Sequence, residues 1–269
     1  MIADIGGRRF EWGSRTYVMG IINTTPDSFS GDGVGTDQEL AIAQGLRMVR
    51  EGADMLDVGG ESTRPGHQPI GVADEIARTE AVVAQLAREA EIPVSIDTYK
   101  LEVAEAAVAA GATILNDIWG LTRSPALAEL AATSGCALVV MHNQDGTDYT
   151  GDLMKEIKRF LRASVDRAVQ AGVPRERVLI DPGIGFGKTA EHNWIVMRRL
   201  FELRELDQPI LIGTSRKSFI GKLLDLPVGE RVEGTAATTT AAILRGADVV
   251  RVHDVREMTR VARFADHMR

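Results

Sequence analysis

Polar side chains recur along the sequence at the points where short apolar segments end. An Asp or Asn in such a place often serves only as a helix N-cap, because its side chain accepts a hydrogen bond from a free backbone N–H group. That interpretation suffices for one residue, but polar residues follow every one of the apolar segments. They are Asn23, Asp57, Asp97, Asn116, Asp117, His142, Asp181, Ser215, Arg216, Lys217, Arg251 and His253. The set indicates a common binding pocket.

The residue types in this set indicate what the pocket would bind. Carboxylates that are buried need partners, and a flat heterocycle with an amidine-like edge offers them paired N–H donors. Amide and lysine side chains can serve the carbonyl and ring nitrogens of the same heterocycle. Arg251 lies near the end of the last apolar segment and His253 follows it, at a place where barrel enzymes often bind phosphate. The composition therefore favours a pterin or a purine that carries a phosphate group, without separating the two.

Two kinds of segment alternate along the chain and must position these residues. Short, nearly continuous apolar segments are typical of parallel strands covered on both faces. The predicted strands are 17–22, 55–58, 94–96, 113–115, 137–141, 178–180, 210–212 and 248–252. Longer amphipathic segments between them predict helices. The predicted helices are 38–50, 72–90, 100–109, 126–134, 153–171, 192–203, 234–245 and 256–267.

Strands that each precede a helix predict an α/β protein with a (β/α)₈ TIM-barrel fold. We expect one domain over residues 1–269, with the barrel at 17–269 and a β-hairpin around Gly6-Gly7, within residues 1–16, that caps the barrel floor. Gly52, Gly111 and Gly246 each end a predicted helix, as expected for a repeated left-handed joint. An open doubly wound sheet would need a Gly-rich phosphate turn after the first strand, and residues 23–27 do not provide one.

Three loops carry unusual sequences. Segments 24–35 and 59–71 are long for connections in a compact domain, and such loops are usually functional or disordered. The third, 181–188, ends in Gly187-Lys188 and resembles the end of a Walker A motif, but Pro182 stands where that motif requires glycine. The glycines of this loop therefore indicate a tight turn. The five histidines lack the spacing of a zinc site.

The composition of the chain limits the classes of partner that it can bind. The net charge of −7 and the pI near 5.4 disfavour a nucleic-acid surface, although a local phosphate pocket remains compatible with them. Cys136 is the single cysteine and lies in an apolar run, as expected for a buried structural thiol in a reducing compartment. Neither a signal peptide nor a membrane span is predicted. We therefore expect a cytoplasmic protein without nucleic-acid or membrane partners.

The loop sequences resemble the signatures of dihydropteroate synthases, which are pterin-binding TIM barrels. Eight motifs occur in the family order, and the resemblance covers roughly residues 18–255. The motifs lie at 23–30, 57–66, 95–98, 116–117, 141–142, 181–188, 215–218 and 251–255. An extra residue, Gly31, follows Ser30 where the family often continues directly with Asp-Gly-Gly. This departure affects the expected conformation of the first loop and not the expected reaction.

The resemblance implies transfer of a dihydropterin-methyl group from its pyrophosphate to p-aminobenzoate, which gives dihydropteroate and pyrophosphate. It also implies Mg²⁺ as a cofactor, bound at Asn23. By resemblance, the pterin contacts Asp97, Asn116, Met141, Asp181 and Lys217, and the pyrophosphate contacts Asn23, Thr63, Arg64, Arg251 and His253. The p-aminobenzoate site comprises Phe29, Thr63, Pro65, Phe186, Lys217 and Ser218. The implied catalytic residues are Asp27, Asp181, Lys217 and Arg251.

The implied reaction suits an SN1-like path, because an electron-rich dihydropterin can carry positive charge at its methylene group. Closure of the first two loops would exclude water, with Asp27 contributing to the closed state. The resemblance further implies a homodimer formed through outer helices and inhibition by sulfonamides in competition with p-aminobenzoate. The alternatives are a methyltetrahydrofolate–corrinoid methyltransferase and a pterin-binding barrel without catalysis. The absence of a histidine cluster disfavours a metal-dependent hydrolase.

Overall fold

The computed structural model describes residues 1–24, 34–62 and 69–269, and for residues 34–37 the backbone alone. Its main feature is an eight-stranded parallel sheet in the order β8-β7-β6-β5-β4-β3-β10-β9. The edges meet through a bridge between Ile180 and Ile210, which closes the sheet into a barrel. The strands are β3 (Tyr17–Asn23), β4 (Met55–Gly59), β5 (Val94–Asp97), β6 (Ile114–Asp117), β7 (Ala137–Met141), β8 (Val178–Asp181), β9 (Leu211–Ile212) and β10 (Val249–Val252). The predicted fold class is confirmed.

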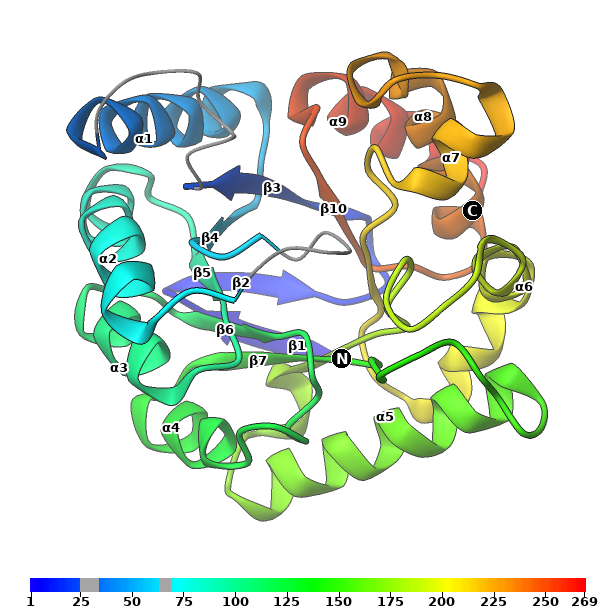
Figure 1. The fold of residues 1–269 in the computed structure, drawn as a ribbon, viewed down its shortest axis with the longest axis horizontal. Helices are drawn as coiled ribbons and strands as arrows, with labels where there is room; N and C mark the ends of the chain where they lie inside the picture. Colours follow the sequence, from blue (N-terminus) through cyan, green and yellow to red (C-terminus); the bar gives the residue numbers. More distant parts are fainter. Residues whose placement is uncertain (25–33, 63–68) are drawn as a thin grey trace.

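Helices surround the barrel (Figure 1). They are α1 (Val34–Glu51), α2 (Val72–Glu89), α3 (Leu101–Ala109), α4 (Ala126–Ser134), α5 (Leu153–Gln170), α6 (Ala190–Arg199), α7 (Ser218–Leu224), α8 (Val232–Leu244) and α9 (Val255–Asp266). The described residues also form the short 3₁₀ helices η2 (Arg175–Arg177), η3 (Leu200–Leu206) and η4 (Val228–Glu230). Within the described ranges, no helix is long and apolar enough to cross a membrane.

The strands are apolar throughout because both of their faces are buried. In β7, Leu138 and Val140 belong to the large core between the barrel and its helices. The alternate residues, Ala137 and Val139, belong to a second core inside the barrel. Side chains of a strand point alternately to opposite faces, so one continuous apolar segment supplies both cores.

An N-terminal hairpin fills the floor of the barrel. Strands β1 (Ile2–Ile5) and β2 (Arg8–Glu11) pair in antiparallel fashion around Gly6-Gly7. Both glycines have positive φ, of 54° and 75°, which a two-residue hairpin turn of this type requires. Phe10 and Trp12 then stack inside the barrel, with ring centroids 5.4 Å apart. The hairpin leaves the opposite rim, at the carboxyl ends of the strands, as the place for a site.

Element boundaries agree with the sequence expectations to within a few residues, and the left-handed joints are confirmed. Gly52, Gly111 and Gly246 have φ of 102°, 110° and 96°. Among the α-helices of the described residues, α7 was not predicted; it lies in the connection between β9 and α8. It has seven residues and lacks a side-chain N-cap, so it carries little local signal.

Candidate active site

Four polar side chains from four strands meet at the rim of the barrel. Arg251 in β10 donates through Nε to Asp57 Oδ2 in β4 at 2.5 Å, and through Nη2 to Asp97 Oδ2 in β5 at 2.6 Å. Asn116 in β6 donates through Nδ2 to the same Asp57 oxygen at 2.9 Å. These residues are far apart in sequence, and the strand order β6-β5-β4-β3-β10 of the curved sheet brings them together.

The charges of this cluster are strongly coupled. Burial raises the pKa of Asp97 above its usual value even though Arg251 acts in the opposite direction. Burial opposes the charge of Arg251, but Asp57 and Asp97 raise the pKa of its guanidinium overall. Asp57 Oδ1 is buried without a hydrogen-bond partner among the described residues. Asp57 Oδ1 can therefore accept a further hydrogen bond at the rim.

Asp181 and Lys217 form a second charged group at the rim. Asp181 ends β8, and burial raises the pKa of its carboxyl to about 6 despite a hydrogen bond from the backbone N–H of Gly183. Burial, together with Arg251, lowers the pKa of Lys217 to about 8. Titratable groups with shifted pKa values that share one rim are typical of functional sites.

The turn that carries Lys217 is held in an unfavourable conformation. Arg216 has φ of 57°, a left-handed value that is uncommon for a non-glycine residue. Its Nε donates to Asp254 at 3.0 Å, and its backbone N–H donates to Thr235 Oγ1 at 3.1 Å. Arg231 donates to its carbonyl at 2.9 Å. These contacts compensate the strain and fix the direction of Lys217.

His253 lies beside this turn as a neutral ring. Its Nδ1 is 3.0 Å from Ser215 Oγ, and its backbone N–H donates to the same hydroxyl at 3.1 Å. Burial, followed by the nearby Arg216 and Arg251, lowers the pKa of His253 to about 3. A neutral imidazole can donate one hydrogen bond to a phosphate oxygen without adding charge.

Phe186 lies against Lys217. The Lys217 ammonium is 4.2 Å from the centre of the Phe186 ring, within the range of a cation–π contact. Gly185 allows this approach, since a Cβ at that position would lie 3.2 Å from Lys217 Cδ. Ser218 is exposed at the start of α7, directly after Lys217.

The remaining residues predicted from sequence fall in two groups. Met141 is buried at the end of β7, paired with Asp181, and Asn23 is partly buried at the end of β3, paired with Gly59. The others lie outside the described residues. They are Asp27, Phe29, Thr63, Arg64 and Pro65.

Two features of the rim were missed or misjudged from the sequence. Asp57 was grouped with the pocket residues but assigned to no ligand, and Lys188 was in neither set; in the structure Asp57 links Arg251 to Asn116, and Lys188 is buried. Asp117, grouped with the pocket residues, instead accepts from the backbone N–H groups of Trp119 and Leu121 in a local turn. Asp117 therefore has the local role of binding free backbone N–H groups, because both of its carboxylate oxygens accept hydrogen bonds from the turn that follows it.

One lysine contacts Glu61 and Ile70, which lie on either side of residues 63–68 in the sequence. Lys100 Nζ donates to Glu61 at 2.7 Å, to the carbonyl of Ile70 at 2.8 Å and to Glu75 at 2.6 Å. Glu61 also accepts from the backbone N–H of Ile70 at 3.0 Å. All three side chains of this cluster are largely buried. The residues that flank the segment are therefore fixed beside the rim.

The donor set fits Mg²⁺ held mainly by a substrate. No group of three or more His, Cys, Asp or Glu side chains within residues 1–24, 34–62 and 69–269 is arranged to hold a metal ion. Asn23 supplies a side-chain oxygen at the rim, which is the type of ligand that Mg²⁺ prefers. One or two protein oxygens suffice when substrate phosphates provide the other ligands.

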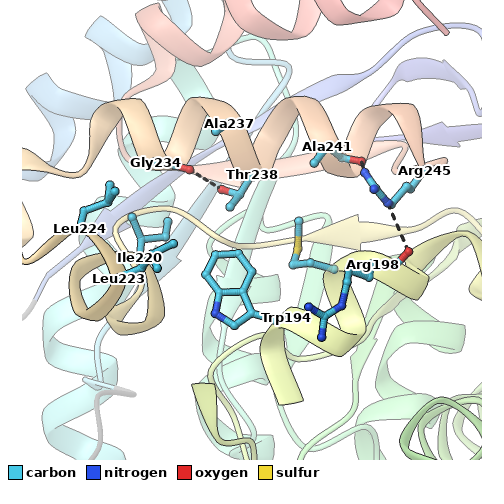
Figure 2. Close-up of a pocket in the computed structure, with 11 residues that line it drawn as sticks. Trp194, Arg198, Ile220, Leu223, Leu224, Gly234, Ala237, Thr238, Ala241 and Arg245 are labelled. Atoms are coloured by element: carbon cyan, nitrogen blue, oxygen red, sulfur yellow. Dashed lines mark hydrogen bonds between the residues drawn. The ribbon is translucent and has the colours of Figure 1, made fainter. Parts of the chain in front are cut away.

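A separate apolar pocket of about 330 Å³ lies on the outside of the barrel, between α6, α7 and α8. Figure 2 shows Trp194 from α6, Ile220, Leu223 and Leu224 from α7, and Thr238 from α8 around it. Leu223 and Leu224 are exposed, at 66% and 45%. This pocket is lined by residues other than those of the charged rim and is not its extension.

Comparison with known proteins identifies the family. The profile of the family described as pterin binding enzyme matches residues 19–253. A dihydropteroate synthase of Clostridium beijerinckii is 48% identical, over 97% of each chain. The structure of a dihydropteroate synthase from Clostridium difficile in the presence of pteroic acid is 48% identical, with a TM-score of 0.94 over 96% of this chain and 98% of that one.

A second structural relative is the Yersinia pestis dihydropteroate synthase in complex with a sulfonamide drug. It is 38% identical, with a TM-score of 0.92 over 100% of this chain and 99% of that one. These similarities cover nearly the whole chain and exceed what a shared fold alone produces. This protein therefore belongs to the pterin-binding enzyme family and, within it, to the dihydropteroate synthases.

Proposed function

We propose that this protein condenses 6-hydroxymethyl-7,8-dihydropterin pyrophosphate with p-aminobenzoate to give 7,8-dihydropteroate and pyrophosphate. The observation that carries this proposal is the charged rim, where Asp97, Asn116, Asp181, Lys217 and Arg251 from separate strands and loops face one site. The relatives named above support it, since each is a dihydropteroate synthase over nearly its full length.

The pterin would be held by the carboxylates and amide of the rim. Asp97 and Asp181 accept hydrogen bonds from the N–H groups of the heterocycle when they are ionised, and Asn116 and Lys217 serve its ring nitrogens and carbonyl. Met141 packs beside Asp181 at the end of β7 and would supply an apolar contact to the ring. These groups arrive on rigid strand ends, so the pterin would be oriented before reaction.

The reaction would proceed by loss of pyrophosphate before attack by the aniline nitrogen. Arg251 and His253 would stabilise charge on the departing oxygens, with Thr63 and Arg64 as further contacts by resemblance. Asp181 faces the ring and would stabilise positive charge that develops on the pterin methylene group. The amine of p-aminobenzoate then forms the C–N bond and loses a proton. No side-chain nucleophile is needed in this sequence.

Mg²⁺ is the proposed cofactor, with Asn23 as its protein ligand. When bound, it would neutralise charge on the pyrophosphate. Asn23 stands at the end of β3, near the strand that carries Arg251, because β3 and β10 are neighbours in the barrel. Asp27 is proposed to contribute to a closed state of the first loop that excludes water.

The p-aminobenzoate site is proposed at Phe186, Lys217 and Ser218, with Phe29, Thr63 and Pro65 completing it by resemblance. The contact between Lys217 and the Phe186 ring supports this, as it places a cation near a flat apolar wall suited to an aromatic carboxylate. Sulfonamides should then inhibit in competition with p-aminobenzoate. Steady-state kinetics at saturating pterin pyrophosphate would test this, and non-competitive inhibition would contradict it.

Release of pyrophosphate tests the proposed reaction directly. The assay combines pterin pyrophosphate with and without p-aminobenzoate and Mg²⁺, and measures pyrophosphate together with dihydropteroate. We expect both products only when all three components are present. Tight pterin binding without product under every condition would favour a non-catalytic barrel. Methyl transfer from methyltetrahydrofolate to a corrinoid would favour the methyltransferase.

We further propose a homodimer in which a second copy covers the pocket between α6, α7 and α8. An exposed apolar patch on a protein surface commonly marks an interface, and Leu223 and Leu224, which line this pocket, are exposed. Leu224→Asp should shift the protein to a monomer in sedimentation velocity. A dimer that persists in this variant at micromolar concentration would exclude this face.

The expected cytoplasmic location is likewise a proposal, testable by cell fractionation.

A further inference from the structure

Lys188 is a buried cation that the proposed reaction does not use. Its side chain is only 8% exposed, and it follows the glycines of the loop after β8. Gly187-Lys188 resembles the end of a Walker A motif, but Pro182 stands where that motif requires glycine, so the motif does not explain Lys188. A lysine is rarely buried without a specific partner, so its contacts indicate its role.

The ammonium of Lys188 links two parts of the rim. Its Nζ is 2.8 Å from His142 Nδ1 and donates to the carbonyl of Phe186 at 3.0 Å. Burial lowers the pKa of Lys188 to about 7. In its protonated form the ammonium is only a donor, so His142 then accepts at Nδ1 and has its proton at Nε2. Burial and the charge of Lys188 lower the pKa of His142 to about 3, which keeps the ring neutral.

His142 is a firm anchor for this link. Its backbone N–H donates to the carbonyl of Asp181 at 2.9 Å, at the junction of β7 and β8. Its ring packs edge-on against Phe160 of α5, with centroids 4.9 Å apart. The side chain is 3% exposed. Lys188 thus ties the carbonyl of Phe186 to a ring that is itself fixed by the barrel and by a helix.

The loop has a backbone shaped to accept the lysine. Gly183 has φ of 72°, and a Cβ there would lie 2.0 Å from the carbonyl oxygen of His142 and 3.3 Å from Lys188 Nζ. The N–H of Phe186 donates to the carbonyl of Gly183 at 3.1 Å, which completes a turn. Tyr149 donates to the carbonyl of Gly187 at 2.8 Å. The loop therefore lies directly on the end of β7.

We propose that Lys188 is a positioning residue: by tying the Phe186 carbonyl to His142, it sets the Phe186 ring against Lys217 and shapes the wall that receives p-aminobenzoate. The inference rests on the proposed function, because it assigns Phe186 to the p-aminobenzoate site. Lys188 touches neither substrate in this scheme and acts through Phe186. Its loss should therefore weaken the use of p-aminobenzoate more than the chemistry.

A double-mutant cycle tests this role. Lys188→Met removes the donor and keeps the length of the side chain, and we expect it to raise the KM for p-aminobenzoate about tenfold while kcat changes less than about threefold. In a Phe186→Ala background the same substitution should leave KM unchanged, because residues that act through one another are not additive. Lys155→Met, at an exposed position in α5, is the matched control and should behave as the unsubstituted protein.

Three results would overturn the inference. They are an unchanged KM in Lys188→Met, an equal rise in KM in both backgrounds, or a fall in kcat alone. If Lys188→Met does not fold, as judged by thermal unfolding, His142→Phe removes the acceptor side of the same link and is subject to the same cycle and criteria. If the unsubstituted protein shows no turnover dependent on p-aminobenzoate, the proposed function fails. Normal turnover with no coupling between Lys188 and Phe186 refutes this inference alone.

Discussion

At the scale of single residues, the rim balances its charges. Asp57, Asp97 and Asp181 supply three carboxyl groups, and the basic groups opposite them are Arg251, Lys217 and Lys188, the last two with pKa values lowered by burial. Each group is costly to bury alone, because a charge loses its hydration in the interior. Together they form a site of low net charge that can accept a neutral heterocycle and, beside it, an anionic leaving group.

Arg251 should be more important for stability than an ordinary surface arginine. Arg251→Met leaves the buried carboxylates of Asp57 and Asp97 without their partner, and breaking such a pair costs about 3–5 kcal/mol. Chemical denaturation would measure the change in the free energy of unfolding. The double variant Asp57→Asn with Arg251→Met is the control, and it should recover part of the loss. A destabilisation below about 1 kcal/mol in the single variant, typical of exposed pairs, would contradict this account.

The carboxylates also predict how pH affects pterin binding. Burial raises the pKa of Asp181 to about 6 and also raises that of Asp97. Each carboxyl is protonated below its pKa and then loses an acceptor for the pterin N–H groups. Affinity for 6-hydroxymethylpterin should therefore fall as pH drops through this range, by up to about tenfold per pH unit for one proton.

Calorimetric titrations between about pH 5.5 and 8 would measure this dependence, since a tenfold change in affinity corresponds to ~1.4 kcal/mol. Asp181→Asn binds more weakly but should show a flatter pH profile, because it cannot titrate. Affinity that rises as pH falls would show that the carboxylates bind the pterin in their protonated form.

At the scale of elements, the strands deliver the rim residues and the loops set their final positions. Gly183 illustrates the second contribution. Gly183→Ala combines a left-handed backbone with a contact to the His142 carbonyl, whereas Gly146 has φ of 77° and a methyl group added there would meet open space. Gly146→Ala should cost about 1–2 kcal/mol from backbone strain alone.

Gly183→Ala should cost a further ~1–3 kcal/mol, because the methyl group forces the loop away from β7. It should also raise the KM for p-aminobenzoate, since the loop carries Phe186. The measurements are denaturant unfolding of both variants and their steady-state kinetics. If both substitutions lower the free energy of unfolding equally, the contact with the His142 carbonyl does not contribute to the loss of stability.

At the scale of the whole molecule, the hairpin and barrel share one interior core. Phe10 and Trp12 pack with Tyr17, Met19 and inward residues of other strands, so the hairpin should unfold with the barrel. We therefore predict a single domain over residues 1–269. Differential scanning calorimetry should show one transition, in which the calorimetric and van't Hoff enthalpies agree.

Phe10→Ala provides the check on this prediction. It removes a buried aromatic side chain, which typically costs about 3–5 kcal/mol. The single transition should move to lower temperature and remain single. A separate early transition, with the main one unchanged, would mean that the hairpin is an independent unit.

The sequence predicted the elements well where the physical signal is local. The strands around Leu56, Leu138 and Val250 read as apolar because they are buried on both faces, and Gly111 marked a helix end because its φ of 110° suits glycine. Helix α7 was missed because seven residues without a side-chain cap carry too little periodicity. The candidate site was predicted from its motifs, since polar residues at strand ends stand out against apolar segments.

What the sequence could not decide was which polar residue bonds to which. Asp57 and Arg251 are 194 positions apart, and their ion pair exists only because β4 and β10 both flank β3 in the closed barrel. Asp117 has the same type and placement as Asp57, yet it turns into its own loop. The buried link from Lys188 to His142 likewise has no sequence signature. Residue types and periods determined the fold and the chemistry available, whereas pairing and burial, which set charge and pKa, depend on distances that only the tertiary structure creates.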